Sequence, residues 1–217
     1  SQQITVGPYL TSAPPTEYLL RPEPERPTEK GEGPVRFLFL NSVTERKGLD
    51  KLIDAFAALG PKLDARWKLR VVGDGALLPG LRDRCQRLGL SEVVEFAGRV
   101  PYAQIWDEYR EADVVLCPAL QDYRSLAGFE ALNARRPVVL SVMDGAAHEL
   151  AAKSDAAWVV DPNDQSALRA VLERFLTDDG FLADAKKRAS EPPQSFTVEA
   201  VSDNVVSVVL EALHTPA

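Results

Sequence analysis

Short apolar runs alternate with helix-like segments from residue 35 onward, and this alternation restricts the fold more than any other feature of the chain. Nearly continuous apolar runs are typical of strands buried on both faces of a parallel sheet. Strands separated by helices form right-handed βαβ units, so we expect an α/β fold with helices on both faces of a doubly wound parallel sheet of about six strands. An eight-stranded barrel needs more units than the chain holds. The predicted strands are residues 35–43, 68–75, 93–100, 113–120, 137–142 and 156–161.

The segments between these runs carry apolar residues at helical spacing. In the last of them, Leu168, Leu172 and Phe175 fall on one stripe, and Asp164 is the expected N-terminal cap. The predicted helices are residues 48–59, 77–90, 102–112, 127–135, 145–152 and 164–178.

The two ends of the chain have a different composition. Residues 1–34 contain ITVGPYL, which is either a short strand or the end of a linker, followed by a proline-dense stretch. Proline at this density disfavours helices and sheet ladders and favours an extended segment. We therefore expect the packed domain to span residues 35–195. Residues 196–217 are expected to form a C-terminal helix that packs either on its own sheet or across an interdomain surface.

Charge and cysteine content limit the function classes. A formal net charge of -7 argues against nucleic acid and anionic membranes as main partners. The two cysteines, Cys85 and Cys117, fall in a predicted helix and a predicted strand, as expected for reduced core thiols of a cytoplasmic protein. We find no signal-peptide pattern and no apolar run of membrane-spanning length.

Ligands of doubly wound sheets lie beyond the carboxyl ends of the strands, so the residues that follow each strand are the candidate site. Gly73 and Gly75 flank Asp74 at the end of the second strand, where glycine allows either a tight turn or the approach of a ligand. A dinucleotide fingerprint requires a third glycine where the chain has Leu78. A nicotinamide site is therefore not expected.

Cations and carboxylates follow two other strands. Arg46 and Lys47 precede a predicted helix, whose free N–H groups favour an anion such as phosphate; the alternative is two solvated side chains. Asp122 follows the fourth strand, and Glu130 lies eight positions later, near the first turn of the next helix. These carboxylates either bind the hydroxyls of a ribose or are structural.

Metal chemistry has little support in the sequence. Asp161, Asp164, Asp178 and Asp179 fall at a predicted helix end and cap, and no cluster of His and Cys ligands is present. His148 is expected to be a residue at the start of a helix and not a catalytic base.

The order of these motifs is more specific than any single one. The motifs are KG at 47–48, VVGDG at 71–75, FAGRV at 96–100, the acidic pair Asp122 and Glu130 after Pro118, RPVV at 136–139, DGAAHEL at 144–150 and VVDPND at 159–164. This order resembles the C-terminal, donor-binding domain of retaining GT-B-fold glycosyltransferases of family 4, also called group 1, whose sheet is Rossmann-like. The resemblance covers about residues 35–178, and it makes residues 1–34 an interdomain strand and linker.

The resemblance implies a function and a set of site residues. Lys47 is similar to the lysine that holds the donor diphosphate, Asp122 to the acid that faces the transferred sugar, and Glu130 to the acid that binds the ribose. These three form the implied catalytic set. The implied substrate-binding residues are Ser42, Arg46, Lys47, Gly73, Asp74, Gly75, Arg99, Val100, Arg124, Ser125, Leu126 and Glu130, with Arg99 and Val100 beside the nucleobase.

The implied donor is a UDP-, GDP- or ADP-sugar, with no cofactor and no essential metal. The implied partners are a glycan or lipid-linked acceptor and an N-terminal domain that completes the active site. Association of the full-length protein with a membrane surface is a further expectation.

Several positions depart from the family pattern. Asn41 and Ser42 stand where a Gly-Arg pair is usual, Arg124 and Ser125 replace Phe-Gly, and Arg135 replaces a glycine. Arg124 is a candidate to replace the lost cation. Two alternatives therefore stay open: a binding domain that has lost turnover, and a nucleotide-sugar epimerase on the same fold.

Overall fold

The computed structural model describes residues 33–191 together with residues 202, 203, 206, 207 and 210. The predicted ITVGPYL strand, the proline-rich segment and most of the predicted C-terminal helix lie outside these residues. The domain boundaries drawn at residues 35 and 195 therefore stay predictions.

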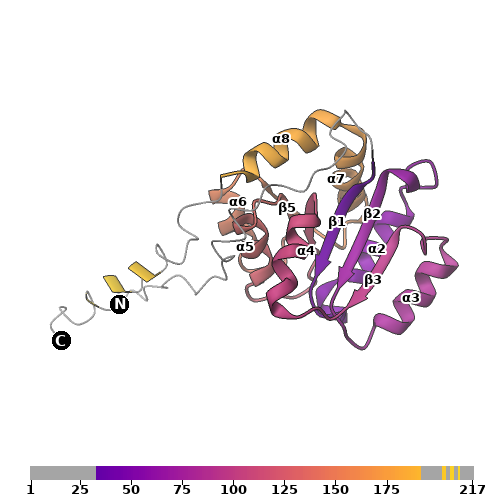
Figure 1. The fold of residues 1–217 in the computed structure, drawn as a ribbon, viewed down its shortest axis with the longest axis horizontal. Coiled ribbons are helices and arrows are strands. Elements are labelled where there is room, and N and C mark those ends of the chain that lie inside the picture. Colours follow the sequence, from indigo (N-terminus) through magenta and orange to yellow (C-terminus); the bar gives the residue numbers. More distant parts are fainter. Residues whose placement is uncertain (1–32, 192–201, 204–205, 208–209, 211–217) are drawn as a thin grey trace.

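A six-stranded parallel sheet forms the centre of the domain, with the strand order β3-β2-β1-β4-β5-β6 (Figure 1). Parallel neighbours with helical crossovers confirm the predicted α/β, doubly wound fold. The strands are β1 (Val35–Leu40), β2 (Trp67–Val72), β3 (Val94–Gly98), β4 (Val114–Cys117), β5 (Val138–Ser141) and β6 (Ala157–Val160).

Helices cover both faces of the sheet, which is why its strands are apolar on both sides. In β1, Phe37 and Phe39 belong to one buried cluster with α2, α3 and α7, whereas Leu38 belongs to a second cluster with α4, α5 and α6. The first cluster includes the stack of Phe56 on Trp67, with ring centroids 4.2 Å apart. The helices are α2 (Leu49–Ala57), α3 (Leu78–Arg87), α4 (Ile105–Glu111), α5 (Leu126–Asn133), α6 (Ala147–Lys153), α7 (Gln165–Thr177) and α8 (Asp179–Ala189).

Most predicted elements exist, but their bounds differ. Every strand is shorter than predicted, because residues beyond its carboxyl end leave the ladder to form loops; β1, for example, ends at Leu40 and not at residue 43. The segment 102–112 divides into a 3₁₀ turn, η3 (Tyr102–Gln104), and α4. The predicted cap is confirmed, since the Asp164 side chain accepts a hydrogen bond from the Ala167 N–H.

Helix α8 was not predicted from the sequence. It follows α7 after one residue, Asp178, whose backbone leaves the helical region and whose side chain caps α8 by accepting from the Phe181 N–H. Asp178 and Asp179 therefore begin a helix, which gives their acidic pair a structural role. At the amino-terminal end of β4, Lys186 of α8 pairs with Asp113.

Both cysteines are buried and unpaired, as predicted for core thiols. Burial raises the pKa of Cys85 to about 11 and raises the pKa of Cys117 further, so both stay protonated at neutral pH.

The end of α5 contains the one non-glycine residue with positive φ in the described part of the chain. Arg135 has φ 60°. Its N–H donates to the Leu132 carbonyl (2.9 Å), and the Arg136 N–H donates to the Ala131 carbonyl (2.8 Å). This pair of bonds is a Schellman motif, in which the left-handed position favours glycine. Arg135 therefore holds a conformation that glycine adopts without strain.

We expect Arg135→Gly to stabilise the fold by about 0.5–1 kcal/mol. Relief of the left-handed strain, about 1–2 kcal/mol, is partly offset by the greater freedom of glycine in the unfolded chain. Urea unfolding measures the change. The control is Ala170→Gly on the exposed face of α7, which should lose about 1 kcal/mol. A destabilised Arg135→Gly protein would mean that the arginine side chain contributes more than its backbone strain costs.

Candidate nucleotide-sugar site

A lysine and an aspartate meet at the topological switch point of the sheet. Strands β1 and β4 are neighbours, and the chain leaves them toward opposite edges. Lys47, in the 3₁₀ turn η1 (Glu45–Lys47) after β1, donates from Nζ to Asp122 Oδ2 in the loop after β4. Each side chain is 9% exposed. Because ligands of such sheets bind at the switch point, this ion pair marks the candidate site.

Arg46 adds a second positive charge beside the pair. Its guanidinium is half-exposed and lies 3.7 Å from Asp122 Oδ1. Its Nη1 donates to the Gln121 carbonyl (3.1 Å), and its own carbonyl accepts from the Leu120 N–H (2.9 Å). Two cations therefore lie beside one carboxylate, so the group formed by Lys47, Arg46 and Asp122 carries a net positive charge.

Backbone hydrogen bonds link the loops at this edge into one continuous belt. The Val43 N–H, after β1, donates to the Asp74 carbonyl after β2 (2.9 Å). The Asp122 N–H donates to the Met143 carbonyl after β5 (3.2 Å), and the Gly145 N–H donates to the Asp122 carbonyl (3.1 Å). Asp122 is thus fixed from both sides through its backbone. Such a belt holds the site in one arrangement before any ligand arrives.

Close contact between these loops explains the glycines after β2. A Cβ on Gly73 would lie 1.9 Å from the Asn41 carbonyl oxygen, and a Cβ on Gly75 would lie 2.3 Å from the Val43 carbonyl oxygen. Gly73 has φ 138°, whereas Gly75 does not have positive φ. The neighbouring backbone accounts for both glycines, in agreement with the tight-turn alternative. Their predicted contact with a ligand stays a prediction.

The other predicted residues lie in the loops that follow β1, β2 and β3, at the same edge of the sheet. Ser42 is exposed and donates its backbone N–H to Asn41 Oδ1 (3.0 Å). Arg99 Nε lies 3.7 Å from Asp74 Oδ2, and both side chains are largely exposed. Val100, which follows, is half-buried.

Glu130 is placed differently from Asp122. Helix α5 begins at Leu126, so Glu130 lies just after the first turn, close to its predicted position. It is buried, and the Tyr109 hydroxyl of α4 donates to its Oε2 (2.8 Å). Asp122 and Glu130 therefore belong to one end of the sheet but have separate partners.

The Arg124 side chain contacts one residue of α6 and one residue of α5. Its Nη1 donates to Glu149, and its guanidinium lies 4.3 Å from the ring centre of Phe129. An ion pair and a cation–π contact thus hold the Arg124 side chain against α5 and α6. Of its neighbours in the sequence, Ser125 is buried and Leu126 is exposed.

Asp144 is a site residue that was not singled out from the sequence. It is 1% exposed, and its Oδ1 accepts from the N–H groups of Ser125 (3.2 Å) and Ala146 (2.9 Å). Its Oδ2 is buried without a hydrogen-bond partner in the described structure. Burial raises the pKa of Asp144, and the two backbone donors oppose this rise. Asp144 thus ties the loop after β4 to the loop after β5. The one feature of the sequence that could have identified Asp144 is its position shortly after a predicted strand.

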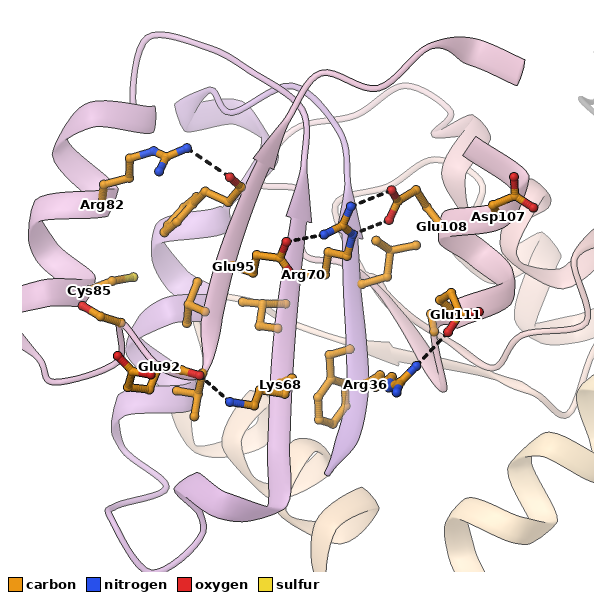
Figure 2. A pocket seen from close by; sticks show the side chains of 18 residues that line it. Arg36, Lys68, Arg70, Arg82, Cys85, Glu92, Glu95, Asp107, Glu108 and Glu111 are labelled. Carbon is orange, nitrogen blue, oxygen red and sulfur yellow. Dashed lines mark hydrogen bonds and ion pairs between the residues drawn. The ribbon is translucent and has the colours of Figure 1, made fainter. Parts of the chain in front are cut away.

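A cavity of about 900 Å³ lies elsewhere, between α3 and α4 over strands β1 to β3. None of the predicted site residues lines it. Figure 2 shows Arg70 between Glu95 and Glu108, and Arg36 directed toward Glu111. Lys68 and Arg82 donate instead to the backbone carbonyls of Glu92 and Phe96. Four cations and five carboxylates line the cavity, so it offers no excess of positive charge to a phosphate.

Among the described residues, neither the Lys47–Asp122 site nor the cavity contains a cluster of metal ligands. In residues 33–191 and the few described beyond them, no group of three or more His, Cys, Asp or Glu residues is arranged to hold a metal ion. His148 is exposed in the first turn of α6, as predicted.

The model of the family described as glycosyl transferases group 1 matches residues 21–191. The chain belongs to this family. An uncharacterised glycosyltransferase of Methanocaldococcus jannaschii is 29% identical over 180 residues, which cover 81% of this chain and 45% of that protein. The putative colanic acid biosynthesis glycosyltransferase WcaL of Escherichia coli K12 is 28% identical over 195 residues, which cover 87% of this chain and 48% of that protein. This group 1 glycosyltransferase chain therefore spans less than half the length of either relative.

A solved structure shares the fold of the group 1 chain. Anabaena HepE, determined in complex with UDP and glucose, superposes with a TM-score of 0.70 at 20% sequence identity, covering 82% of this chain and 48% of that one. This superposition confirms the predicted GT-B-type fold, and the match over residues 21–191 confirms the predicted family. None of the helices in the described part of the chain is long and apolar enough to span a membrane.

Proposed function

We propose that this chain is the donor-binding half of a retaining glycosyltransferase that transfers a hexose-type sugar to a glycan or lipid acceptor. The observation that carries the proposal is the Lys47–Asp122 pair, with Arg46 beside it, at the carboxyl ends of β1 and β4. A nucleoside diphosphate supplies two anionic groups that match this excess of positive charge. The two relatives named above are glycosyltransferases, and HepE was solved with UDP and glucose, which supports a UDP-sugar as the first donor to test.

The proposed roles follow from chemistry and position. Lys47 and Arg46 stabilise the charge that grows on the leaving diphosphate, so no metal is needed for that step. Asp122, held beside them, accepts hydrogen bonds from the transferred sugar. Glu130 accepts hydrogen bonds from the ribose. The diphosphate has to compete with Asp122 for Lys47, which predicts weak binding by the chain alone.

A preceding domain is proposed to supply the acceptor side and to exclude water. The chain spans less than half of its relatives, and positioning two substrates is a large part of catalysing such a transfer.

Stability in the presence of nucleotides tests the proposal. The 217-residue chain is melted with UDP, GDP or ADP at millimolar concentration, and calorimetry follows any shift. A ligand that binds only the folded state raises the free energy of unfolding by about 2.7 kcal/mol at one hundred times its dissociation constant. We expect one nucleoside diphosphate to raise the melting temperature and its free nucleoside to raise it less. Flat melting curves and no heat for all three would rule the proposal out.

A second candidate is a nucleotide-binding domain without turnover. The ion pair between Arg124 and Glu149 favours this candidate. An arginine that is paired with Glu149 does not replace the cation that is missing at Asn41 and Ser42. Nucleotide binding without sugar transfer by the full-length protein would select it, and product analysis separates transfer from epimerisation.

A further inference from the structure

Tyr109 is a fully buried residue of α4 whose hydroxyl donates to Glu130 Oε2 at 2.8 Å. The contact joins two crossover helices, α4 and α5, on the same face of the sheet. The ring of Trp106, one turn earlier in α4, lies 5.7 Å away and packs beside the phenol. The tyrosine is therefore held rigidly on both its apolar and its polar side.

Charge and burial fix the direction of this hydrogen bond. Burial raises the pKa of Tyr109 well above 10, and the nearby Glu130 carboxylate raises it further. The phenol keeps its proton and acts as the donor, whereas the carboxylate is the acceptor. Charge-assisted bonds of this kind are stronger and more directional than neutral ones.

The bond occupies part of the accepting capacity of one carboxylate oxygen. A carboxylate has about four lone-pair sites, so Glu130 keeps sites for two further donors. In the described part of the chain, Tyr109 is the residue that hydrogen-bonds the Glu130 side chain. The rotation of the carboxylate, and hence the direction of its remaining lone pairs, is set by this tyrosine.

We propose that Tyr109 is a positioning residue that orients the Glu130 carboxylate toward the ribose hydroxyls of the donor nucleotide. The inference rests on the proposed function, because it assumes that Glu130 binds a ribose. A functional group that touches a ligand needs a support whose own geometry is locked, and a buried phenol packed on Trp106 is such a support.

The test compares nucleotides with and without ribose hydroxyls. The affinities of the 217-residue chain for UDP, GDP and ADP are measured by calorimetry, and the tightest is compared with its 2′,3′-dideoxy form. In Tyr109→Phe, the ribonucleotide is expected to bind about 3- to 10-fold more weakly, as for loss of one hydrogen bond. Affinity for the dideoxy form is expected to stay within about twofold, well below a tenfold change.

Two further variants make the comparison specific. Tyr102→Phe removes a hydroxyl from an exposed tyrosine just before α4 and should change neither affinity. Glu130→Gln should abolish the preference for the ribonucleotide, and adding Tyr109→Phe to it should have no further effect. Glu130→Gln is informative even if Tyr109→Phe does not fold.

The outcomes separate this inference from the proposed function. If no nucleotide binds to the wild-type chain, both are overturned. If the wild type prefers the ribonucleotide and Tyr109→Phe keeps that preference, or loses affinity for both forms equally, only the role of Tyr109 is overturned. If Glu130→Gln keeps the preference, the ribose contact lies elsewhere and the inference fails as well.

Discussion

Gly48→Ala is expected to destabilise the fold by about 3–5 kcal/mol, through left-handed strain of about 1–2 kcal/mol and severe overpacking. Gly48 lies between η1 and α2 with φ 68°, and a Cβ there would lie 2.0 Å from the Pro118 carbonyl oxygen. The obstacle is backbone at the end of β4, which cannot move aside as a flexible side chain can. At about 2–4 °C per kcal/mol, the melting temperature should fall by roughly 6–20 °C.

Gly89 provides the matched control. It also has positive φ, at 73°, but no atom lies within 4 Å of the position of its Cβ. Gly89→Ala should therefore lose only about 1–2 kcal/mol, the cost of the left-handed conformation alone. Equal losses at Gly48 and Gly89 in urea unfolding would contradict the importance of the contact with Pro118.

The layers of the fold were predictable because they depend on local patterns. Alternating apolar runs and helical stripes predicted six strands and six helices in the right order. Phe37 and Leu38 pack into different hydrophobic clusters, as expected for a strand that is buried on both faces. Strand ends were not predictable, because the belt of hydrogen bonds between loops decides where each ladder stops. Helix α8 was missed because a single residue, Asp178, separates it from α7.

The candidate site was predictable as a region but not as a set of contacts. Lys47 and Asp122 were both expected at the carboxyl edge, but their direct pairing joins residues 75 positions apart. The support of Glu130 by Tyr109 depends on how two helices pack, and a tyrosine inside an apolar helix face gives no sequence signal of its own. The pairing of Arg124 with Glu149 could not be predicted from the sequence either, although both residues lie in segments that follow predicted strands.

Lys47→Met is expected to destabilise the fold by about 3–5 kcal/mol and to abolish nucleotide binding, since breaking a buried ion pair leaves a buried charge without its partner. Lys47 and Asp122 are each 9% exposed as side chains, and Arg46 at 3.7 Å is too distant and too exposed to neutralise Asp122 alone. The free energy of unfolding in urea and the affinity for UDP, GDP and ADP are measured on the same variant.

A second substitution separates the two losses. Adding Asp122→Asn removes the uncompensated charge, so the double variant should regain most of the lost stability, as expected when both members of a buried pair are neutralised. It should not regain nucleotide binding, because the cation that faces the diphosphate is still absent. Arg188→Met is the control, since Arg188 pairs with Asp184 within α8, both side chains are half-exposed, and its loss should cost about 1 kcal/mol or less without changing nucleotide affinity. Recovery of nucleotide binding in the double variant would show that the lysine contributes only to folding, and the phosphate site would then have to be sought at Arg46 or Arg99.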